Sequence, residues 1–234
     1  MRRLKLDRFV GVVSAGKEAR VYRAIGRDGR EYAVKIYLTA TAEFRKGIQK
    51  YLLGDPRFQN IDISSTKKLF MAWARKEYRN LLKMSSAGVR VPTPYLVYQN
   101  IVVMEFIGHQ GYRAPLLHEI YNELGSEELY SIYRAMVEEY KKIYCCAGLV
   151  HADYSEYNIM YLDGEIYIID VAQAVSTSHP NYLDFLKHDV RNIYRFFTKQ
   201  AKLKIQNLED LMKEIIGCKI ECPKKQSRQR GAQR

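Results

Sequence analysis

An apolar stretch in the second half of the chain is interrupted by polar residues whose types could do chemistry. In "LVHADYSEYNIMY", residues 149–161, the side chains of His151, Asp153 and Asn158 stand between apolar segments. Burying a carboxylate and an amide beside apolar strands is costly unless these groups are paired or bind something. We therefore expect functional side chains here, joined by Asp170, which ends the next apolar strand, "IYIID".

The spacing of these residues indicates phosphoryl transfer. "HADYSEYN" fits H-x-D-x-x-x-x-N, the pattern of kinase catalytic loops, in which the aspartate orients or deprotonates the acceptor hydroxyl and the asparagine binds magnesium. A strand-end carboxylate beside an asparagine oxygen suits a hard cation, because Mg²⁺ takes oxygen ligands and keeps bonds to substrate phosphates. We predict that Asp153 is catalytic and that Asn158 and Asp170 bind the metal.

A second group of candidates lies in the first part of the chain. In "YAVKIY", Ala33 and Lys35 share one face of a predicted strand, so Ala33 can lie against a flat base while Lys35 reaches phosphates. Glu77, four residues from both Trp73 and Leu81, lies on the apolar stripe of a predicted helix, where a carboxylate needs a cation. We predict a Lys35–Glu77 ion pair. The alternatives are a solvated lysine on an edge strand and a glutamate exposed at the helix boundary.

The segment "GVVSAGKEARVY" places a glycine-containing turn between two predicted strands. Its letters G-x-x-x-x-G-K, from Gly11 to Lys17, match the start of an NTPase phosphate loop, but Glu18 stands where Ser or Thr would hold magnesium. A hairpin rather than a helix follows, so we reject that interpretation. The segment fits the kinase pattern G-x-G-x-x-G-x-V with only the middle glycine kept, and a plain strand turn explains it equally well.

The order of elements predicts an α+β protein with a strand-rich first part and a helical second part. Strands joined by an Asp28-Gly29 turn are expected in residues 9–37, and a helix from Leu69 to Met84. The two lobes are expected to join near residues 107–111, and clefts between lobes are where small ligands bind. Further helices are expected near residues 114–122, 126–147, 181–200 and 207–216. The predicted limits are a first lobe at 1–107 with a mobile loop at about 55–68, a second lobe at 108–222, and a basic disordered tail at 223–234.

The composition of the chain indicates its cellular compartment and the class of its binding partners. The 234 residues are 47% hydrophobic and can bury a core, whereas the longest uncharged apolar runs, such as "IVVM", are far shorter than the roughly 20 residues of a membrane span. The N-terminus has no apolar signal region, so we predict a cytosolic protein with no membrane contact. The net charge of +12 favours a partner rich in phosphate, such as RNA, and the alternative is a basic surface that only maintains solubility.

The four cysteines do not indicate a metal site. Cys145 and Cys146 are adjacent in a predicted helix, and Cys218 and Cys222 lie four apart with no second pair to complete a zinc site. We predict a structural or neutral role for all four.

Taken together, these motifs resemble the RIO atypical protein kinases, and within them the type 1 branch. The resemblance covers nearly the whole chain, through "SAGKEARVY", "AVKIY", "YLLGDPRF", "WARKEYRNL", "VVMEFIG", "LVHADYSEYNIMY", "IYIIDVAQAV" and "FLKHDVRNIYRFF". The type 2 branch carries a winged-helix domain ahead of the kinase region, whereas this sequence enters the phosphate loop by residue 11, which favours type 1. The resemblance implies a bilobal protein-kinase-like fold, with a small antiparallel sheet lobe and a helical lobe, that lacks the usual activation loop.

The resemblance also implies further site residues. Ser14 and Lys17 would contact phosphates, and the backbone of Glu105 and Ile107 would hold adenine behind Met104. The ion pair, the catalytic aspartate and the two metal ligands would be those predicted above. The letters "DVAQ" replace the D-F-G of ordinary kinases, so control by a moving phenylalanine is not expected.

By this resemblance the protein would use ATP with Mg²⁺, or with Mn²⁺ in its place, as a serine/threonine kinase and ATPase in maturation of the small ribosomal subunit. Pre-ribosomal RNA and proteins would be its partners, serine autophosphorylation would occur, and the metal-site aspartate could itself be phosphorylated. Two alternatives remain open. One is an aminoglycoside-type small-molecule phosphotransferase, which shares the catalytic-loop pattern. The other is a non-catalytic RNA-binding assembly factor that holds ATP as a structural ligand.

Overall fold

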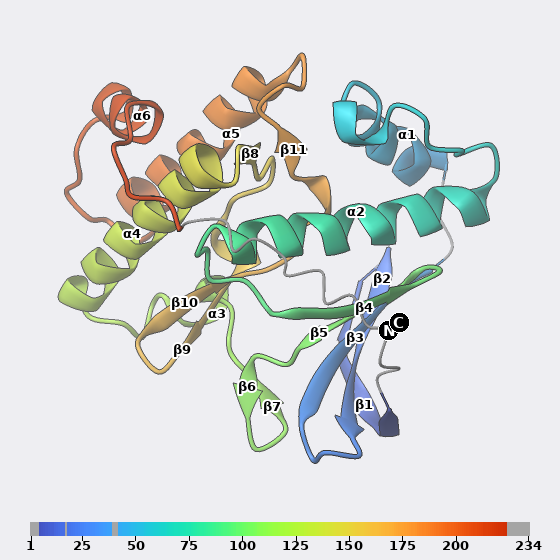
Figure 1. Ribbon diagram of the computed structural model, residues 1–234. Helices are drawn as coiled ribbons and strands as arrows, with labels where there is room; N and C mark the ends of the chain where they lie inside the picture. Colours follow the sequence, from blue (N-terminus) through green and yellow to red (C-terminus); the bar gives the residue numbers. More distant parts are fainter. Residues whose placement is uncertain (1–4, 17, 39–41, 224–234) are drawn as a thin grey trace.

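A five-stranded antiparallel sheet forms one end of the molecule and helices form the other (Figure 1). The computed structural model describes residues 5–16, 18–38 and 42–223. The strand order is β1-β2-β3-β5-β4, with antiparallel pairing throughout. The strands are β1 (Leu6–Ala15), β2 (Ala19–Gly26), β3 (Glu31–Tyr37), β4 (Pro94–Tyr98) and β5 (Ile101–Glu105). The predicted α+β fold is confirmed.

Side chains on both faces of the central strand β3 are buried. Ala33 belongs to the main hydrophobic core, whereas Tyr32 and Val34 belong to a small separate cluster on the other face of the sheet. Alternation along a strand explains this division, because successive side chains point to opposite faces. The predicted turn between β2 and β3 is also present: Gly29 has a φ of 77°, and Asp28 Oδ1 accepts a hydrogen bond from the Arg30 N–H.

Helix α2 (Thr66–Ser86) lies between the sheet and the helical part, as Figure 1 shows. It begins three residues before the predicted Leu69, because the Ser65 side chain caps it by accepting from the Lys68 N–H at 3.3 Å. The end of the segment predicted as a mobile loop at 55–68 is therefore helical. Its beginning is the 3₁₀ turn η1 (Pro56–Phe58), whose Phe58 is buried. The preceding helix is α1 (Ala42–Leu52).

A hairpin stands near residues 107–111, where the two lobes were predicted to join. Strands β6 (Gly108–His109) and β7 (Tyr112–Arg113) pair across a turn. A Cβ on Gly108 would lie 2.1 Å from the Tyr112 carbonyl oxygen, so this close pairing requires glycine. The helices that follow are α3 (Leu117–Ile120), shorter than the predicted 114–122, α4 (Ser126–Lys141), α5 (Tyr182–Arg195) and α6 (Leu208–Ile216). The π turns η2 (Lys142–Cys146) and η5 (Phe196–Gln200) continue α4 and α5 to the predicted ends.

Two short antiparallel pairs hold the loops that carry the polar residues. Strand β8 (Leu149–Val150) pairs with β11 (Val175–Ser176), and β9 (Ile159–Leu162) pairs with β10 (Glu165–Ile168). The loop at 151–158, which contains the 3₁₀ turn η3 (Glu156–Asn158), therefore begins at β8 and ends at β9. The loop at 169–174, which contains η4 (Val171–Gln173), follows β10 and leads into β11. Only residues 171–181 separate Asp170 from α5, which leaves no room for a long activation loop.

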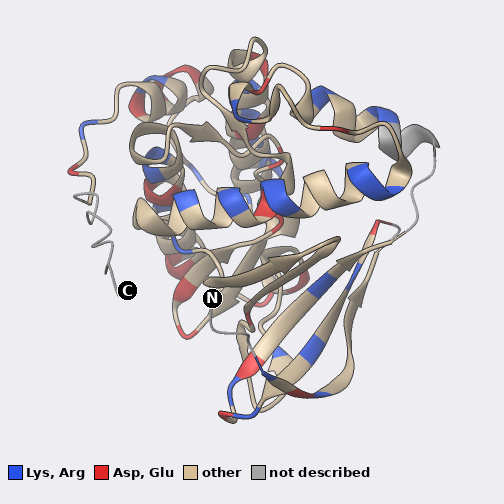
Figure 2. Ribbon diagram, turned by 45° about the vertical axis from the view of Figure 1, so that its right-hand side comes forward, with Lys and Arg blue, Asp and Glu red and all other residues tan. Residues whose placement is uncertain are grey.

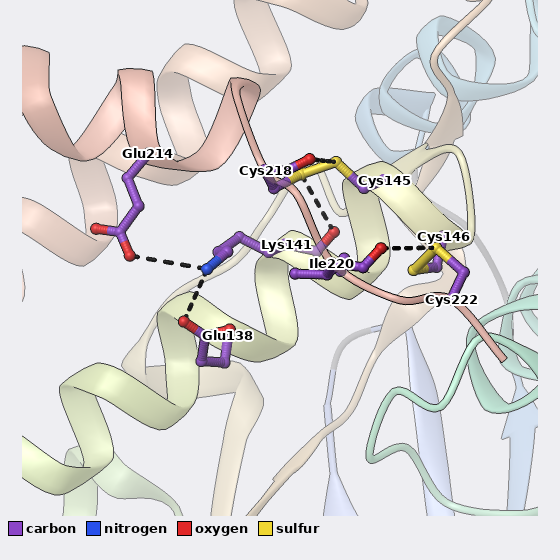
Figure 3. Close-up of a disulfide and its surroundings, with 8 residues drawn as sticks. All are labelled: Glu138, Lys141, Cys145, Cys146, Glu214, Cys218, Ile220 and Cys222. Atoms are coloured by element: carbon purple, nitrogen blue, oxygen red, sulfur yellow. Dashed lines mark hydrogen bonds and ion pairs between the residues drawn. A yellow bond between two sulfur atoms is a disulfide. The ribbon is translucent and has the colours of Figure 1, made fainter.

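The cysteines form two disulfides, Cys145–Cys218 and Cys146–Cys222 (Figure 3). They join the π turn after α4 to the segment after α6. Beside them, Lys141 Nζ lies 2.8 Å from Glu138 Oε1 and 3.9 Å from Glu214 Oε1, which links α4 to α6. The pairing gives all four cysteines a structural role, although the sequence did not predict the pairs.

Some predictions fall on residues that the structure does not describe. Lys17 and nearly all of the basic tail, residues 224–234, are among them. Within the described ranges, none of the helices is long and apolar enough to cross a membrane.

Candidate active site

A cavity of about 510 Å³ lies between the sheet and the loops at 151–158 and 169–174. This volume is within the usual range for small-ligand sites, about 300–1,000 Å³. Among the predicted site residues, the cavity wall includes Ser14, Lys35, Glu77, Met104, Glu105, Ile107, Asn158 and Asp170. Asp153 lies next to this wall and donors from two lining residues reach it. The structure therefore brings together every predicted site residue that it describes.

Lys35 connects the sheet, α2 and the loop after β10. Its Nζ donates to Glu77 Oε1 at 2.7 Å and to Asp170 Oδ1 at 2.9 Å, and the Tyr37 hydroxyl donates to the second Glu77 oxygen at 2.6 Å. Both alternatives for the pair are therefore wrong, because Lys35 is 8% exposed and Glu77 is 1% exposed. Burial alone would lower the pKa of Lys35, but Asp170 and Glu77 outweigh burial and hold this pKa above its ordinary value. Lys35 stays positively charged in the cavity.

The Asp170 carboxylate faces the cavity with 46% of its side chain exposed. Burial would raise its pKa, but the Lys35 ammonium outweighs burial and lowers the pKa below the ordinary value. The residue has a φ of 53° and a ψ of 57°, a left-handed conformation that non-glycine residues adopt infrequently. The chain turns sharply here, immediately after β10, and continues into η4.

Asp153 is held by two amide side chains. Asn158 Nδ2 donates to its Oδ2 at 3.0 Å and to its backbone oxygen at 2.8 Å, and Gln173 Nε2 donates to the same Oδ2 at 3.3 Å. Neither amide engages the other carboxylate oxygen, Oδ1. Burial raises the pKa of Asp153 above its ordinary value, and the Asp170 carboxylate adds to this effect. Gln173 was not predicted from the sequence.

Asp189 of α5 is a second residue that the sequence analysis missed. It is fully buried and accepts from the Ala152 N–H at 2.7 Å, the Tyr154 N–H at 2.9 Å and the Tyr140 hydroxyl at 2.7 Å. The backbone N–H groups of Ala152 and Tyr154 stand on either side of Asp153, and Ala152 has a φ of 68°. Asp189 thus holds a strained backbone around Asp153. A sequence signal existed, because Asp189 is a carboxylate on the apolar face of its helix, between Leu186 and Ile193.

The opposite end of the cavity offers backbone groups. Met104 and Ile107 are buried, and the Ile107 carbonyl already accepts from the Ala114 N–H at 2.9 Å, so its N–H is the group suited to a base. The Glu105 side chain turns away from the cavity, because its Oε2 accepts from the Thr93 hydroxyl at 2.8 Å and the Thr93 N–H at 3.0 Å. The Glu105 N–H also donates to the Thr93 carbonyl at 2.9 Å, so this N–H is not available to a base.

The donor set at the loop end suits magnesium. Mg²⁺ is usually held by one or two carboxylates together with substrate phosphates rather than by a complete protein cage. Among the described residues, no group of three His, Cys, Asp or Glu side chains forms such a cage. The Asp170 carboxylate and the Asn158 amide oxygen both line the cavity, and the Asn158 nitrogen is already directed at Asp153. These two residues are thus a partial ligand set that phosphate oxygens would complete.

Comparison with known sequences places this site in a described family. The sequence model of the RIO domain matches residues 20–210. The RIO-type serine/threonine-protein kinase Rio1 of Haloferax volcanii is 44% identical over 196 residues, which are 84% of this chain and 65% of that protein. The serine/threonine-protein kinase RIO1 of Caenorhabditis elegans is 40% identical over 207 residues, 88% of this chain and 40% of that protein. The chain thus spans less than two thirds of the length of these relatives.

Comparison with solved structures supports the fold. The crystal structure of the Rio2 kinase from Chaetomium thermophilum aligns with a TM-score of 0.56 and 21% identity, over 88% of this chain and 63% of that one. The ADP/Mg²⁺-phosphoaspartate complex of the same kinase aligns with a TM-score of 0.53 at 21% identity, over 88% of this chain and 61% of that one. The kinase-like arrangement of a sheet lobe and a helical lobe is therefore confirmed.

Proposed function

The chain belongs to the RIO domain family, and on that premise we propose that it is a serine/threonine protein kinase with an associated ATPase activity, dependent on ATP and Mg²⁺. Mn²⁺, which accepts the same oxygen ligands, is proposed as a substitute metal. One observation carries the proposal. The buried Lys35–Glu77 pair lies in the same cavity as Asn158 and Asp170, and Asp153 lies beside it. Those residue types are the positioning and electrostatic groups that phosphoryl transfer requires.

Each site residue has a separate role in phosphoryl transfer, which follows from its position in the cavity. Lys35 is held charged by two carboxylates and would bind phosphate oxygens. Oδ1 of Asp153, which neither the Asn158 nor the Gln173 amide engages, would accept the hydrogen bond of a serine or threonine hydroxyl and direct the hydroxyl oxygen at the γ-phosphorus. Asn158 and Asp170 would hold Mg²⁺, which neutralises charge on the phosphates when it is bound. The backbone of Glu105 and Ile107 would hold the adenine.

The replacement Asp153→Asn tests this assignment. It should lower single-turnover transfer of the γ-phosphate by about 10²- to 10⁴-fold, the usual contribution of a positioned base, while ATP affinity changes little. Asp184→Asn, an exposed aspartate on α5, is the matched control and should transfer at the normal rate. Transfer by Asp153→Asn at the control rate would show that another group serves as the base.

Following the γ-phosphate also separates kinase from ATPase activity. The Rio2 kinase complex named above contains a phosphoaspartate with ADP and Mg²⁺. We propose the same chemistry for Asp170: a carboxylate oxygen attacks the γ-phosphorus, the bond to the β–γ bridging oxygen breaks, and ADP leaves. Water then cleaves the acyl phosphate, which releases phosphate and restores the carboxylate.

Quenched turnovers of the unmutated protein with Mg²⁺ test this route. Acyl phosphate is labile to hydroxylamine, whereas phosphoserine is stable to it, so one sample distinguishes the two products. We expect a labile fraction that mass spectrometry locates at Asp170. Label that is entirely hydroxylamine-stable would restrict Asp170 to metal binding.

The proposed partner is the RNA and protein of the pre-ribosomal small subunit, and autophosphorylation is proposed beside transfer to an unidentified protein substrate. The net charge of +12 supports an RNA partner. Figure 2 shows Lys and Arg positions along α2, where Arg75, Arg79 and Lys83 are exposed and one helical turn apart. We name these three residues the basic stripe. They form one row that could follow a phosphate backbone.

A cytoplasmic location is also part of the proposal. Disulfides are rare in the cytosol of mesophiles, but they are common in intracellular proteins of hyperthermophiles. If the protein is cytoplasmic in a mesophile, its four cysteines should be reduced there. Alkylation of acid-quenched cells, followed by mass spectrometry of the cysteine peptides, would report the redox state directly.

A further inference from the structure

Helix α2 buries two polar side chains on a face that does not line the cavity. Lys76 and Asn80, one turn apart, are both 0% exposed. Fully buried lysines are rare, and a buried polar group is costly unless hydrogen bonds replace its water. The neighbouring Glu77 points into the cavity and is already accounted for by Lys35. Lys76 and Asn80 therefore need a separate explanation.

Their partners are the backbone carbonyls that follow Asp170. Lys76 Nζ donates to the oxygen of Ala172 at 2.8 Å and to that of Ala174. Asn80 Nδ2 donates to the oxygen of Val171 at 2.7 Å and to that of Ala174 at 2.9 Å. Two side chains of one helix thus bind three carbonyls of this turn, those of Val171, Ala172 and Ala174.

A second layer holds Asn80 in this orientation. Arg57 Nη1 donates to Asn80 Oδ1 at 2.8 Å, so the amide nitrogen must face the loop. The guanidinium is itself fixed by the buried Asp55, with Nε to Oδ1 at 2.9 Å and Nη2 to Oδ2 at 2.6 Å. Arg57 also reaches the Ala174 oxygen at 3.3 Å. Residues 55–57, after α1, and helix α2 therefore hydrogen-bond to the same short turn at residues 171–174.

We propose that Lys76 and Asn80 are positioning residues for the metal site, an inference that rests on the proposed function. The turn that they hold begins at Asp170, in its left-handed conformation, and contains Gln173, which donates to Asp153. Fixing the carbonyls of this turn fixes the direction of the Asp170 carboxylate. Because Glu77 on the same helix fixes Lys35, α2 sets the relative placement of the phosphate-binding lysine and the metal carboxylate.

The test uses Lys76→Met and Asn80→Ser, with Lys67→Met on the exposed face of the same helix as the matched control. Calorimetric titration of ADP in EDTA measures nucleotide binding without metal, and titration of Mg²⁺ at fixed ADP measures the metal. Loss of groups that orient metal ligands usually costs about 10- to 100-fold in metal affinity. We expect the half-saturating Mg²⁺ concentration to rise by that factor in both variants, with metal-free ADP affinity and the control unchanged.

Asn80→Ser keeps the Lys76 contacts and is the variant that tests the proposal if Lys76→Met does not fold. Hydrogen exchange should be faster in the peptide covering residues 171–176 of Asn80→Ser and unchanged in α4. Folded variants with normal Mg²⁺ dependence would overturn the positioning role and leave Lys76 and Asn80 as purely stabilising residues. Failure of the proposed function would look different, because the unmutated chain itself would then not bind Mg²⁺ with ADP.

Discussion

The carboxylate of Asp189 should control both the stability of the fold and the rate of the reaction, and Asp189→Asn measures both effects. In the native protein Oδ2 accepts from the Tyr140 hydroxyl and the Ala152 N–H, and Oδ1 accepts from the Tyr154 N–H. The asparagine oxygen can keep the two bonds of Oδ2. Its amide nitrogen would then face the Tyr154 N–H. Both groups are hydrogen-bond donors, so neither could bond to the other in this buried site.

The magnitude follows from these contacts. One hydrogen bond to a charged group, worth about 1.5–3 kcal/mol, is lost, and each of the other two falls to a neutral bond of about half the strength. We expect the free energy of unfolding to decrease by about 3–6 kcal/mol. The strained Ala152 backbone would relax and move Asp153, and a displacement of about 1 Å can cost roughly 10²-fold in rate.

Urea unfolding followed by circular dichroism measures the first effect, and single-turnover phosphate transfer at a temperature where the variant is folded measures the second. Asp184→Asn, exposed on the same helix, should stay within about 0.5 kcal/mol of the unmutated protein. If Asp189→Asn behaved like this control in both assays, Asp189 would not be holding the catalytic loop.

Three further predictions concern the rest of the molecule. The two disulfides close loops over nearly the same chain, with sequence separations of 73 and 76. Serine replacement of one pair should cost about 2 kcal/mol in urea unfolding, because the other pair still closes the long loop, and replacement of both should cost about 6–7 kcal/mol. A loss that is equal for one pair and for both would contradict the shared-loop reasoning. Arg113 lowers the pKa of Glu119 from 4.5 to about 2, so this carboxyl adds stability above pH 4.5 that is lost as pH falls through about 2. Because the pair is partly exposed, Glu119→Gln should reduce that acid-dependent change by less than about 1 kcal/mol, and an identical pH profile would refute the contribution. Glutamine at all three positions of the basic stripe should flatten the log–log salt dependence of RNA affinity by roughly 2–3, whereas an unchanged slope would assign those charges to solubility.

The local elements were predictable because they depend on patterns within short segments. The alternation in "EYAVKIY" predicted β3, the apolar stripe around Trp73 and Leu81 predicted α2, and the Asp28-Gly29 turn was recognisable from its residues. The ends of elements were less predictable. The cap at Ser65 and the hairpin at 108–113 depend on particular hydrogen bonds and close backbone contacts that a periodic pattern does not contain.

The sequence by itself determined which residue types would do the chemistry. Carboxylates, an amide and a lysine set among apolar segments can persist only where they are paired or bind a ligand, so Lys35, Asp153, Asn158 and Asp170 stood out without any coordinates. Only the tertiary structure decided which of them meet and what holds them. The contacts of Asp189 with Ala152, of Lys76 with Ala172, and between paired cysteines join positions far apart in the chain. The sequence does not distinguish a helix carboxylate that is exposed to water from one that binds a strained backbone. The packing of the elements decides which groups the carboxylate contacts.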